Sequence, residues 1–234
     1  MVKYSGNNML TNNKDIKAWL DRMNIENYTI NESGTVTVEG DVAIGDNQLS
    51  EIPVQFRIVY GDFFCSFNSL KSLNGSPREV GGDFHCSSNS LESLEGSPQE
   101  VGGDFNCRYN RLKALNGSPR EVGGNFNCSS NSLESLEGSP HEIGGNFYCW
   151  NNSLESLEGS PREIGGNFYC WNNSLTSLSG SPQEVGGDFI CYNNRLTTLE
   201  GSPREVGGNF NCRSNNFKTI PNCDTIINGE LFWT

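Results

Sequence analysis

Two consecutive segments of the chain, residues 86–106 and 107–127, read CSSNSLESLEGSPQEVGGDFN and CRYNRLKALNGSPREVGGNFN. Seven complete units of this kind run from Cys65 to Asn211, and weaker copies at 44–64 and 212–232 continue the phase. A fixed period of this length indicates a solenoid, in which each unit forms one coil and buries its apolar residues against its neighbours. The period is marked by eight cysteines, each 21 residues from the next: Cys65, Cys86, Cys107, Cys128, Cys149, Cys170, Cys191 and Cys212.

Each unit contains one short stretch in which apolar and polar residues alternate, such as Gly103–Cys107. Phe105 and Cys107 fall on one side of this stretch and Asp104 and Asn106 on the other, which is the period of a β-strand. The Gly-Gly pair before the stretch and the Gly-Ser-Pro after the leucines are turn signals. The pattern therefore predicts one strand per coil and about ten in-phase parallel strands, from residues 40–44 to residues 229–233.

The apolar residues of the repeat are predicted to form one continuous core. Five columns point inward, namely Phe, Cys, Leu, Leu and Val or Ile. The ladder cysteines are expected to be buried free thiols, because a regular parallel ladder points their Cβ atoms the same way and a disulfide demands other directions. Cys223 lies outside the ladder and is expected to be more exposed. The sequence has no clustered zinc-type ligand spacing, so no metal or cofactor is expected.

The pattern F-x-C-x-x-N-x-L resembles the L-x-L-x-x-N-x-L core of leucine-rich repeats, with Phe and Cys in the first two apolar positions. The resemblance covers residues 40–233 and is to the short bacterial type, although Gly-Gly stands where that family has an apolar residue. It implies an α/β-type, mostly-β repeat solenoid, with parallel strands on the concave face and an extended or turned convex side. It also implies that side-chain amides of a ladder satisfy backbone groups where the strand turns, at Asn89, Asn110, Asn131, Asn152, Asn173 and Asn194.

The ends of the chain are predicted to differ from the repeats. Residues 1–39 are expected to form an N-terminal cap with a helix over about 14–23, started by Asn13, and a strand at 35–38. Residues 40–234 are then the solenoid, with Phe232 and Trp233 as a plug. A monomer is expected, or a dimer through an open solenoid end.

The N-terminal part of the chain indicates where the protein is located in the cell and from what kind of organism it comes. Residues 13–42 resemble the leader of repeat proteins in large tailed phages and giant viruses. The segment Met1–Gly6 lacks the apolar core of a secretory signal, and no run approaches the roughly 20 apolar residues of a membrane span. We therefore expect no membrane contact and a cytoplasmic location, in the host cytoplasm if the chain is viral.

The candidate binding site lies on the outer face of the predicted strands, where the positions before and after each cysteine differ between units. Exposed aromatic clusters normally mark binding surfaces, and Trp, Tyr and Arg dominate interface hot spots. The alternative is that the aromatic pairs are a copied unit that only stabilises the sheet. The candidate residues are Tyr148, Trp150, Tyr169, Trp171, Ile190 and Tyr192, with Asn151 and Asn172 beside them and Arg108, Tyr109 and Arg213 at the flanks.

A second column is acidic. A metal or basic-partner site is one interpretation, and a solvated edge repeated by duplication is the one we prefer. The column contains Glu79, Glu100, Glu121, Glu142, Glu163, Glu184 and Glu205.

These features favour a non-catalytic protein that holds a protein partner on its concave strand face, with a viral accessory or anti-defence role implied by the phage resemblance. An enzyme is not expected, because the sequence has no nucleophile–base grouping, phosphate loop or metal motif. One alternative is a glycan or nucleotide-type small ligand stacked on the aromatic residues. Another is an acidic mimic of nucleic acid that inhibits a basic host protein, since the formal net charge is -12. The same charge argues against direct nucleic-acid binding.

Overall fold

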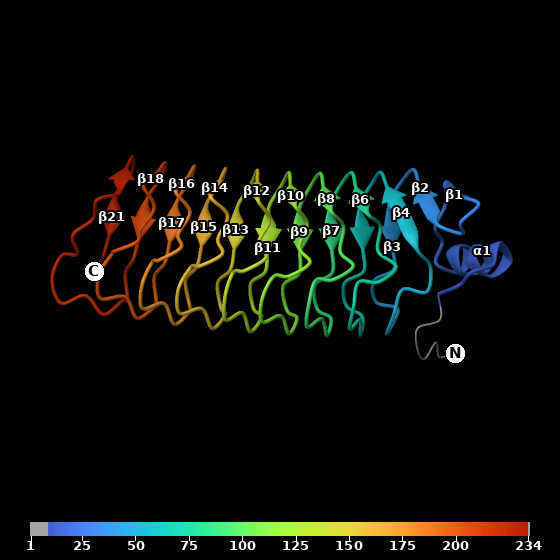
Figure 1. The fold of residues 1–234 in the computed structure, drawn as a ribbon, viewed down its shortest axis with the longest axis horizontal. Coiled ribbons are helices and arrows are strands. Elements are labelled where there is room, and N and C mark those ends of the chain that lie inside the picture. The colour runs from blue at the N-terminus through green and yellow to red at the C-terminus, as the bar shows by residue number, and fades with distance from the viewer. Residues whose placement is uncertain (1–8, 234) are drawn as a thin grey trace.

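The computed structural model describes residues 9–233, so the segment Met1–Gly6 and Thr234 lie outside the described residues. The described residues wind into coils that stack along one long axis, with one helix at the N-terminal end (Figure 1). Two sheets run along this axis, one with 11 strands and one with 10. The predicted mostly-β parallel solenoid is confirmed.

The ten-stranded sheet contains the predicted strands. Its neighbours are parallel and pair at a shift of 21 residues, as Phe126 pairs with Phe147. Identical positions of successive units therefore lie side by side. The strands are β3 (Val42–Ala43), β5 (Phe63–Phe64), β7 (Phe84–His85), β9 (Phe105–Asn106), β11 (Phe126–Asn127), β13 (Phe147–Tyr148), β15 (Phe168–Tyr169), β17 (Phe189–Ile190), β19 (Phe210–Asn211) and β21 (Leu231–Phe232).

The eleven-stranded sheet corrects the prediction of one strand per coil, because each complete unit also has a strand at its Glu-Val or Glu-Ile pair. The residues that flank this pair, Pro-x before it and Gly-Gly after it, do not extend an apolar–polar alternation, so the sequence carries no strand signal there. Among the strand pairs of residues 9–233, β1 and β2 are antiparallel and the others are parallel. The strands are β1 (Tyr28–Ile30), β2 (Val36–Val38), β4 (Phe56–Val59), β6 (Glu79–Val80), β8 (Glu100–Val101), β10 (Glu121–Val122), β12 (Glu142–Ile143), β14 (Glu163–Ile164), β16 (Glu184–Val185), β18 (Glu205–Val206) and β20 (Ile226–Ile227).

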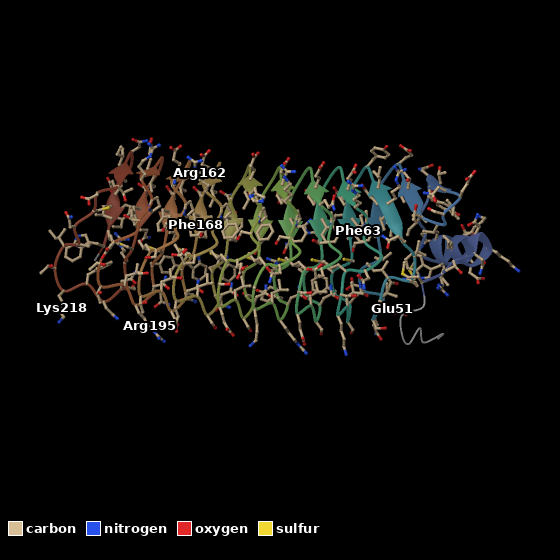
Figure 2. All side chains as sticks on the ribbon, viewed as in Figure 1. Glu51, Phe63, Arg162, Phe168, Arg195 and Lys218 are labelled. Atoms are coloured by element: carbon tan, nitrogen blue, oxygen red, sulfur yellow. The ribbon has the colours of Figure 1, made fainter. Side chains whose placement is uncertain are left out.

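The core fills the inside of the coils, and the five predicted inward columns are all buried. The phenylalanine rings form one stack from Phe63 to Phe189, with neighbouring centroids 5.2 to 5.4 Å apart and planes within 9° of parallel. Figure 2 shows Phe63 and Phe168 inside the solenoid and Arg195 and Lys218 at its lower edge. The eight ladder cysteines are free and fully buried, as expected, while Cys223 is half-buried.

The predicted asparagine ladder is also confirmed, and it connects each coil to the one before it. The Asn110 Nδ2 donates to the Cys107 carbonyl of its own coil at 3.0 Å and to the Cys86 carbonyl of the preceding coil at 3.1 Å. Its Oδ1 accepts from the Leu91 backbone N–H at 3.0 Å. One side chain thus satisfies three backbone groups that would otherwise be buried without partners.

The Gly-Gly pair occupies the corner between the two strands of a coil, where successive coils approach closely. A Cβ built on Gly123 would lie 2.2 Å from the Gly102 carbonyl oxygen. A second ladder runs beside this corner, in which Asp104 Oδ1 accepts from the Asn125 backbone N–H at 2.7 Å. Glycine is therefore required here because neighbouring coils lie too close for a Cβ atom. Interpreting the pair only as a turn signal does not reveal this requirement.

The N-terminal end is covered by α1 (Asn13–Arg22), one residue earlier than predicted, with Asn12 as its N-cap. Asn12 Oδ1 accepts from the Asp15 backbone N–H at 2.9 Å. The helix buries Ile16, Trp19 and Leu20 against the first coils, and the Trp19 ring meets Phe56 edge-on at 6.3 Å. Within residues 9–233, no helix is long and apolar enough to cross a membrane.

The C-terminal end differs from the predicted plug. Trp233 packs against the core, in phase with the cysteines. Phe232 instead pairs with Asn211 in the outward-facing column, and its ring lies 4.6 Å from the Arg213 guanidinium carbon. Of the two predicted plug residues, Trp233 therefore faces the core and Phe232 faces outward, because alternation along a strand sends successive side chains to opposite sides.

Candidate binding surface

The outer face of the ten-stranded sheet brings the predicted aromatic residues together in two rows. Tyr148 and Tyr169 stack with centroids 4.9 Å apart and planes 1° from parallel. Trp150 and Trp171 stack at 4.7 Å, and Trp171 and Tyr192 at 5.2 Å. This follows from the register, because strands lie about 4.8 Å apart and equal positions share one rotamer. We call Tyr148, Trp150, Tyr169, Trp171, Ile190 and Tyr192 the aromatic patch.

The stacking decides which parts of the rings a ligand can reach. All six side chains of the aromatic patch are half-exposed. At centroid distances of 4.7 to 5.2 Å, the facing sides of neighbouring rings cover each other and leave no space for a third ring. The solvent-facing surface of the aromatic patch therefore consists mainly of ring edges, which carry the positive part of the aromatic quadrupole.

The tyrosine hydroxyls of the aromatic patch can donate hydrogen bonds to a partner, because their oxygens already accept bonds from within the protein. Asn146 Nδ2 donates to the Tyr148 hydroxyl oxygen at 3.0 Å, and Asn167 Nδ2 donates to that of Tyr169 at 2.9 Å. Each hydroxyl proton is then available to a partner. Partial burial, and next the nearby Tyr169, raise the pKa of Tyr148, so this phenol stays protonated at neutral pH. The six residues include no carboxylate, in a chain of net charge -12.

The predicted amide neighbours lie at the turn that follows each strand of the ten-stranded sheet. Asn151 and Asn172 have φ of 57° and 56°, a left-handed conformation that Asn tolerates better than most residues. Asn151 Nδ2 donates to Ser130 Oγ at 3.2 Å, and Asn172 Oδ1 accepts from Asn193 Nδ2. Part of the hydrogen-bonding capacity of these two amides is therefore used by the equivalent residues of neighbouring coils. Both amides lie beside the aromatic patch.

The predicted arginines flank the aromatic patch without joining it. Arg108 lies over the ring of its neighbour Tyr109, with its guanidinium carbon 5.5 Å from the centroid. The coil that carries the buried Ser129 separates this pair from Trp150. Arg213 follows Tyr192 by one coil and stacks on Phe232. Both cations are exposed and mark the limits of the surface.

Sequence reasoning did not select Phe64 and His85, which continue the tyrosine column toward the N-terminus. Their rings stack at 4.9 Å with planes 12° apart, and His85 Nε2 lies 3.5 Å from an Asp83 carboxylate oxygen. The signal was present, since both residues stand directly before a ladder cysteine. For metals, the part of the chain that the structure describes places no group of three or more His, Cys, Asp or Glu side chains to hold an ion.

Comparisons with known proteins add one structural likeness. No protein-family model and no curated protein matches the chain. Among solved structures, YopM from Yersinia enterocolitica WA-314 is similar with a TM-score of 0.38 and 13% identity, over 97% of this chain and 70% of that chain. A likeness at this level carries no inference about function. The 21-residue period, the in-register strands and the asparagine ladder show a mostly-β parallel solenoid, which is the architecture that the resemblance to leucine-rich repeats implies.

Proposed function

We propose that the chain is a non-catalytic binding protein that holds a protein partner on the outer face of its ten-stranded sheet through the aromatic patch. The supporting observation is the pair of stacked ring rows, which form a rigid surface of ring edges on three neighbouring coils. Aromatic side chains held in one conformation lose little entropy on binding, which is why they serve as anchors in interfaces. The free hydroxyl protons of Tyr148 and Tyr169 suit backbone carbonyls of a partner.

The same stacking favours a protein over a sugar or nucleobase. Flat ligands bind aromatic side chains through open ring faces, and here the facing sides of neighbouring rings cover each other at 4.7 to 5.2 Å, which leaves open only the outer faces at the ends of the rows. The nucleic-acid mimic is also less favoured, because the acidic column belongs to the other sheet and the aromatic patch itself has no carboxylate.

Changing both Trp150 and Trp171 to Ser is expected to weaken partner binding by about 30-fold or more, the effect of losing a hot spot of about 2 kcal/mol. Serine is a compatible choice because Ser66, Ser87 and Ser129 occupy the same position in other coils. The partner is first captured with the wild-type protein, and the Kd of each variant is then measured by titration with the purified partner.

Phe67→Ser is the matched control for this experiment. Phe67 is 61% exposed and lies outside the aromatic patch, and Ser88 and Ser130 stand at its position in other coils. Its Kd is expected to match the wild type. A double Trp variant with an unchanged Kd and a lower melting temperature would mean that the stack only stabilises the sheet.

We further propose a viral accessory or anti-defence role in a host cytoplasm. It is supported by the resemblance of residues 13–42 to the leaders of phage and giant-virus repeat proteins. If it is correct, the partner that depends on Trp150 and Trp171 will be a host protein and not a component of a virus particle.

A further inference from the structure

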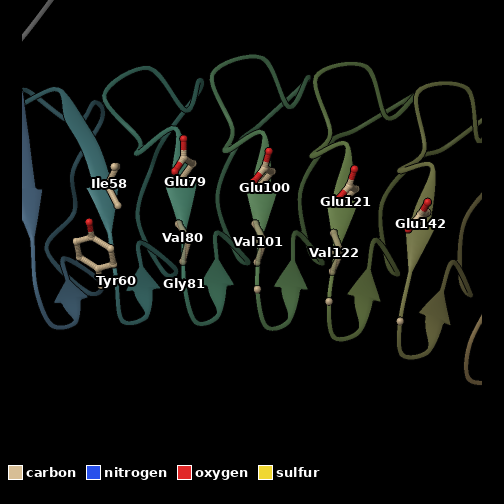
Figure 3. Close-up of a pocket in the computed structure, with 13 residues that line it drawn as sticks. Ile58, Tyr60, Glu79, Val80, Gly81, Glu100, Val101, Glu121, Val122 and Glu142 are labelled. Carbon is tan, nitrogen blue, oxygen red and sulfur yellow. The ribbon is translucent and has the colours of Figure 1, made fainter.

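Two grooves run along the outer face of the eleven-stranded sheet, away from the aromatic patch. The first has a volume of about 540 Å³ and reaches from Tyr60 to Glu142. The second, of about 940 Å³, continues from Glu142 to Asn228. Figure 3 shows the first groove, with Glu side chains along one side, Val80, Val101 and Val122 beside them, and Tyr60 at its N-terminal end.

The first groove is acidic and has an exposed aromatic residue at one end. Four glutamates and no basic side chain line it, whereas the second groove includes Arg162 and His141. Tyr60 is 56% exposed, although most large apolar side chains of the chain are buried. The groove therefore offers negative charge and an aromatic anchor to a single occupant, while its valine side chains point into the core.

Along the groove, glutamates that form an ion pair with an arginine alternate with glutamates that do not. Arg78 lies 3.9 Å from Glu79, and Arg120 lies 3.5 Å from Glu121. In the coils of Glu100 and Glu142 the preceding residue is Gln99 or His141 instead of arginine. Among residues 9–233, neither Glu100 nor Glu142 has an ion-pair partner, and both are exposed. The two free carboxylates of the first groove therefore lie two coils apart.

This spacing matches an extended peptide of one kind. Two coils span about 9.6 Å at the strand spacing of a sheet. A polyproline II chain repeats every three residues with a rise of about 3.1 Å each, or about 9.3 Å. Basic side chains at every third position therefore meet Glu100 and Glu142 in turn.

We propose that the first groove binds an extended, polyproline-type peptide segment with Lys or Arg at every third position. Two of its basic side chains pair with Glu100 and Glu142, and Tyr60 contacts its end. This site is independent of the aromatic patch, because it lies on the other sheet.

The test measures binding of a fluorescent peptide with four Lys-Pro-Pro repeats by anisotropy at low salt. Glu100→Gln with Glu142→Gln is expected to weaken binding about five- to tenfold, since each exposed ion pair contributes modestly. The control is Glu92→Gln with Glu155→Gln, which removes the same charge from exposed positions outside the groove and is expected to change the Kd less than about twofold. Tyr60→Ala is expected to weaken binding as well.

A second peptide of the same composition, with its four lysines in one block, is expected to bind more weakly than the repeated one. Equal binding of the two peptides, equal weakening by the two double variants, or no binding of the repeated peptide would overturn the proposal. Trp150→Ser with Trp171→Ser is expected to leave peptide binding unchanged, so a failure here and a failure of the proposed function are distinguishable.

Discussion

Raising the pH to about 10 is expected to unfold this protein, because eight thiols are buried in its core. Burial raises the pKa of every ladder cysteine above the ordinary value of 9.0, and that of Cys212 to about 12. Below pH 9 the thiols are protonated in both the folded and the unfolded state, so their ionisation does not change the free energy of unfolding. Above pH 9 they ionise only in the unfolded chain, so stability is lost as the pH rises from 9 toward the folded-state pKa values.

The number of thiols makes this effect large. A thiol that stays protonated only in the folded state costs about 1.4 kcal/mol at one pH unit above its unfolded pKa. Eight such thiols cost about 11 kcal/mol at pH 10, as much as the whole stability of an ordinary domain, about 5 to 15 kcal/mol. Urea unfolding followed by circular dichroism from pH 7 to pH 10.5 measures the decline.

Cys128→Ala identifies the ladder as the cause. The variant loses some stability at pH 7, because Cys128 is fully buried and its truncation leaves a small cavity. Its stability is then expected to fall with pH less steeply than that of the wild type, by about 1.4 kcal/mol per pH unit. A wild-type protein that keeps its full stability at pH 10.5, or a slope that Cys128→Ala leaves unchanged, would show that the ladder thiols ionise in the folded state.

The parts of the fold that sequence predicts best are those repeated in every unit. Phe105, Cys107 and Asn110 each stand in a column of equivalent residues, and a period of 21 residues places every column side by side. Burial of the first two and the amide bonding of the third follow from that placement. The strand Glu100–Val101 was missed because the Pro-Gln before it and the Gly-Gly after it do not extend an apolar–polar alternation, as the residues around Phe105–Asn106 do.

The candidate site shows a similar division. The column positions predicted that Trp150, Trp171 and Tyr192 lie side by side on neighbouring strands. The structure stacks them side by side, but two residues beyond the end of each strand. Whether the rings expose faces or edges depends on side-chain rotamers, which spacing does not determine. The bond from Asn146 to the Tyr148 hydroxyl depends on the same torsions. The proposal of a protein partner over a stacked ligand depends on these details, so sequence alone left both open.

Gly123→Ala is expected to destabilise the protein by about 3 kcal/mol or more, near the upper end for overpacking. The added Cβ would lie 2.2 Å from the Gly102 carbonyl oxygen and 3.1 Å from its carbon. Both atoms belong to the backbone, so no rotamer change relieves the contact. The coils cannot separate cheaply either, because the Gly123 N–H donates to the Val101 carbonyl at 2.9 Å and the Gly124 N–H to that of Gly103 at 2.9 Å.

Gly40→Ala separates this clash from the general effect of replacing glycine. A Cβ on Gly40 meets nothing within 4 Å. Both substitutions reduce the freedom of the unfolded chain equally, which by itself stabilises a protein by about 0.4 to 1 kcal/mol. Urea unfolding is therefore expected to show Gly40→Ala at or slightly above wild-type stability and Gly123→Ala far below it. Similar stabilities for the two variants would mean that the coils can move apart at the corner, and that the Gly-Gly pair serves as a turn after all.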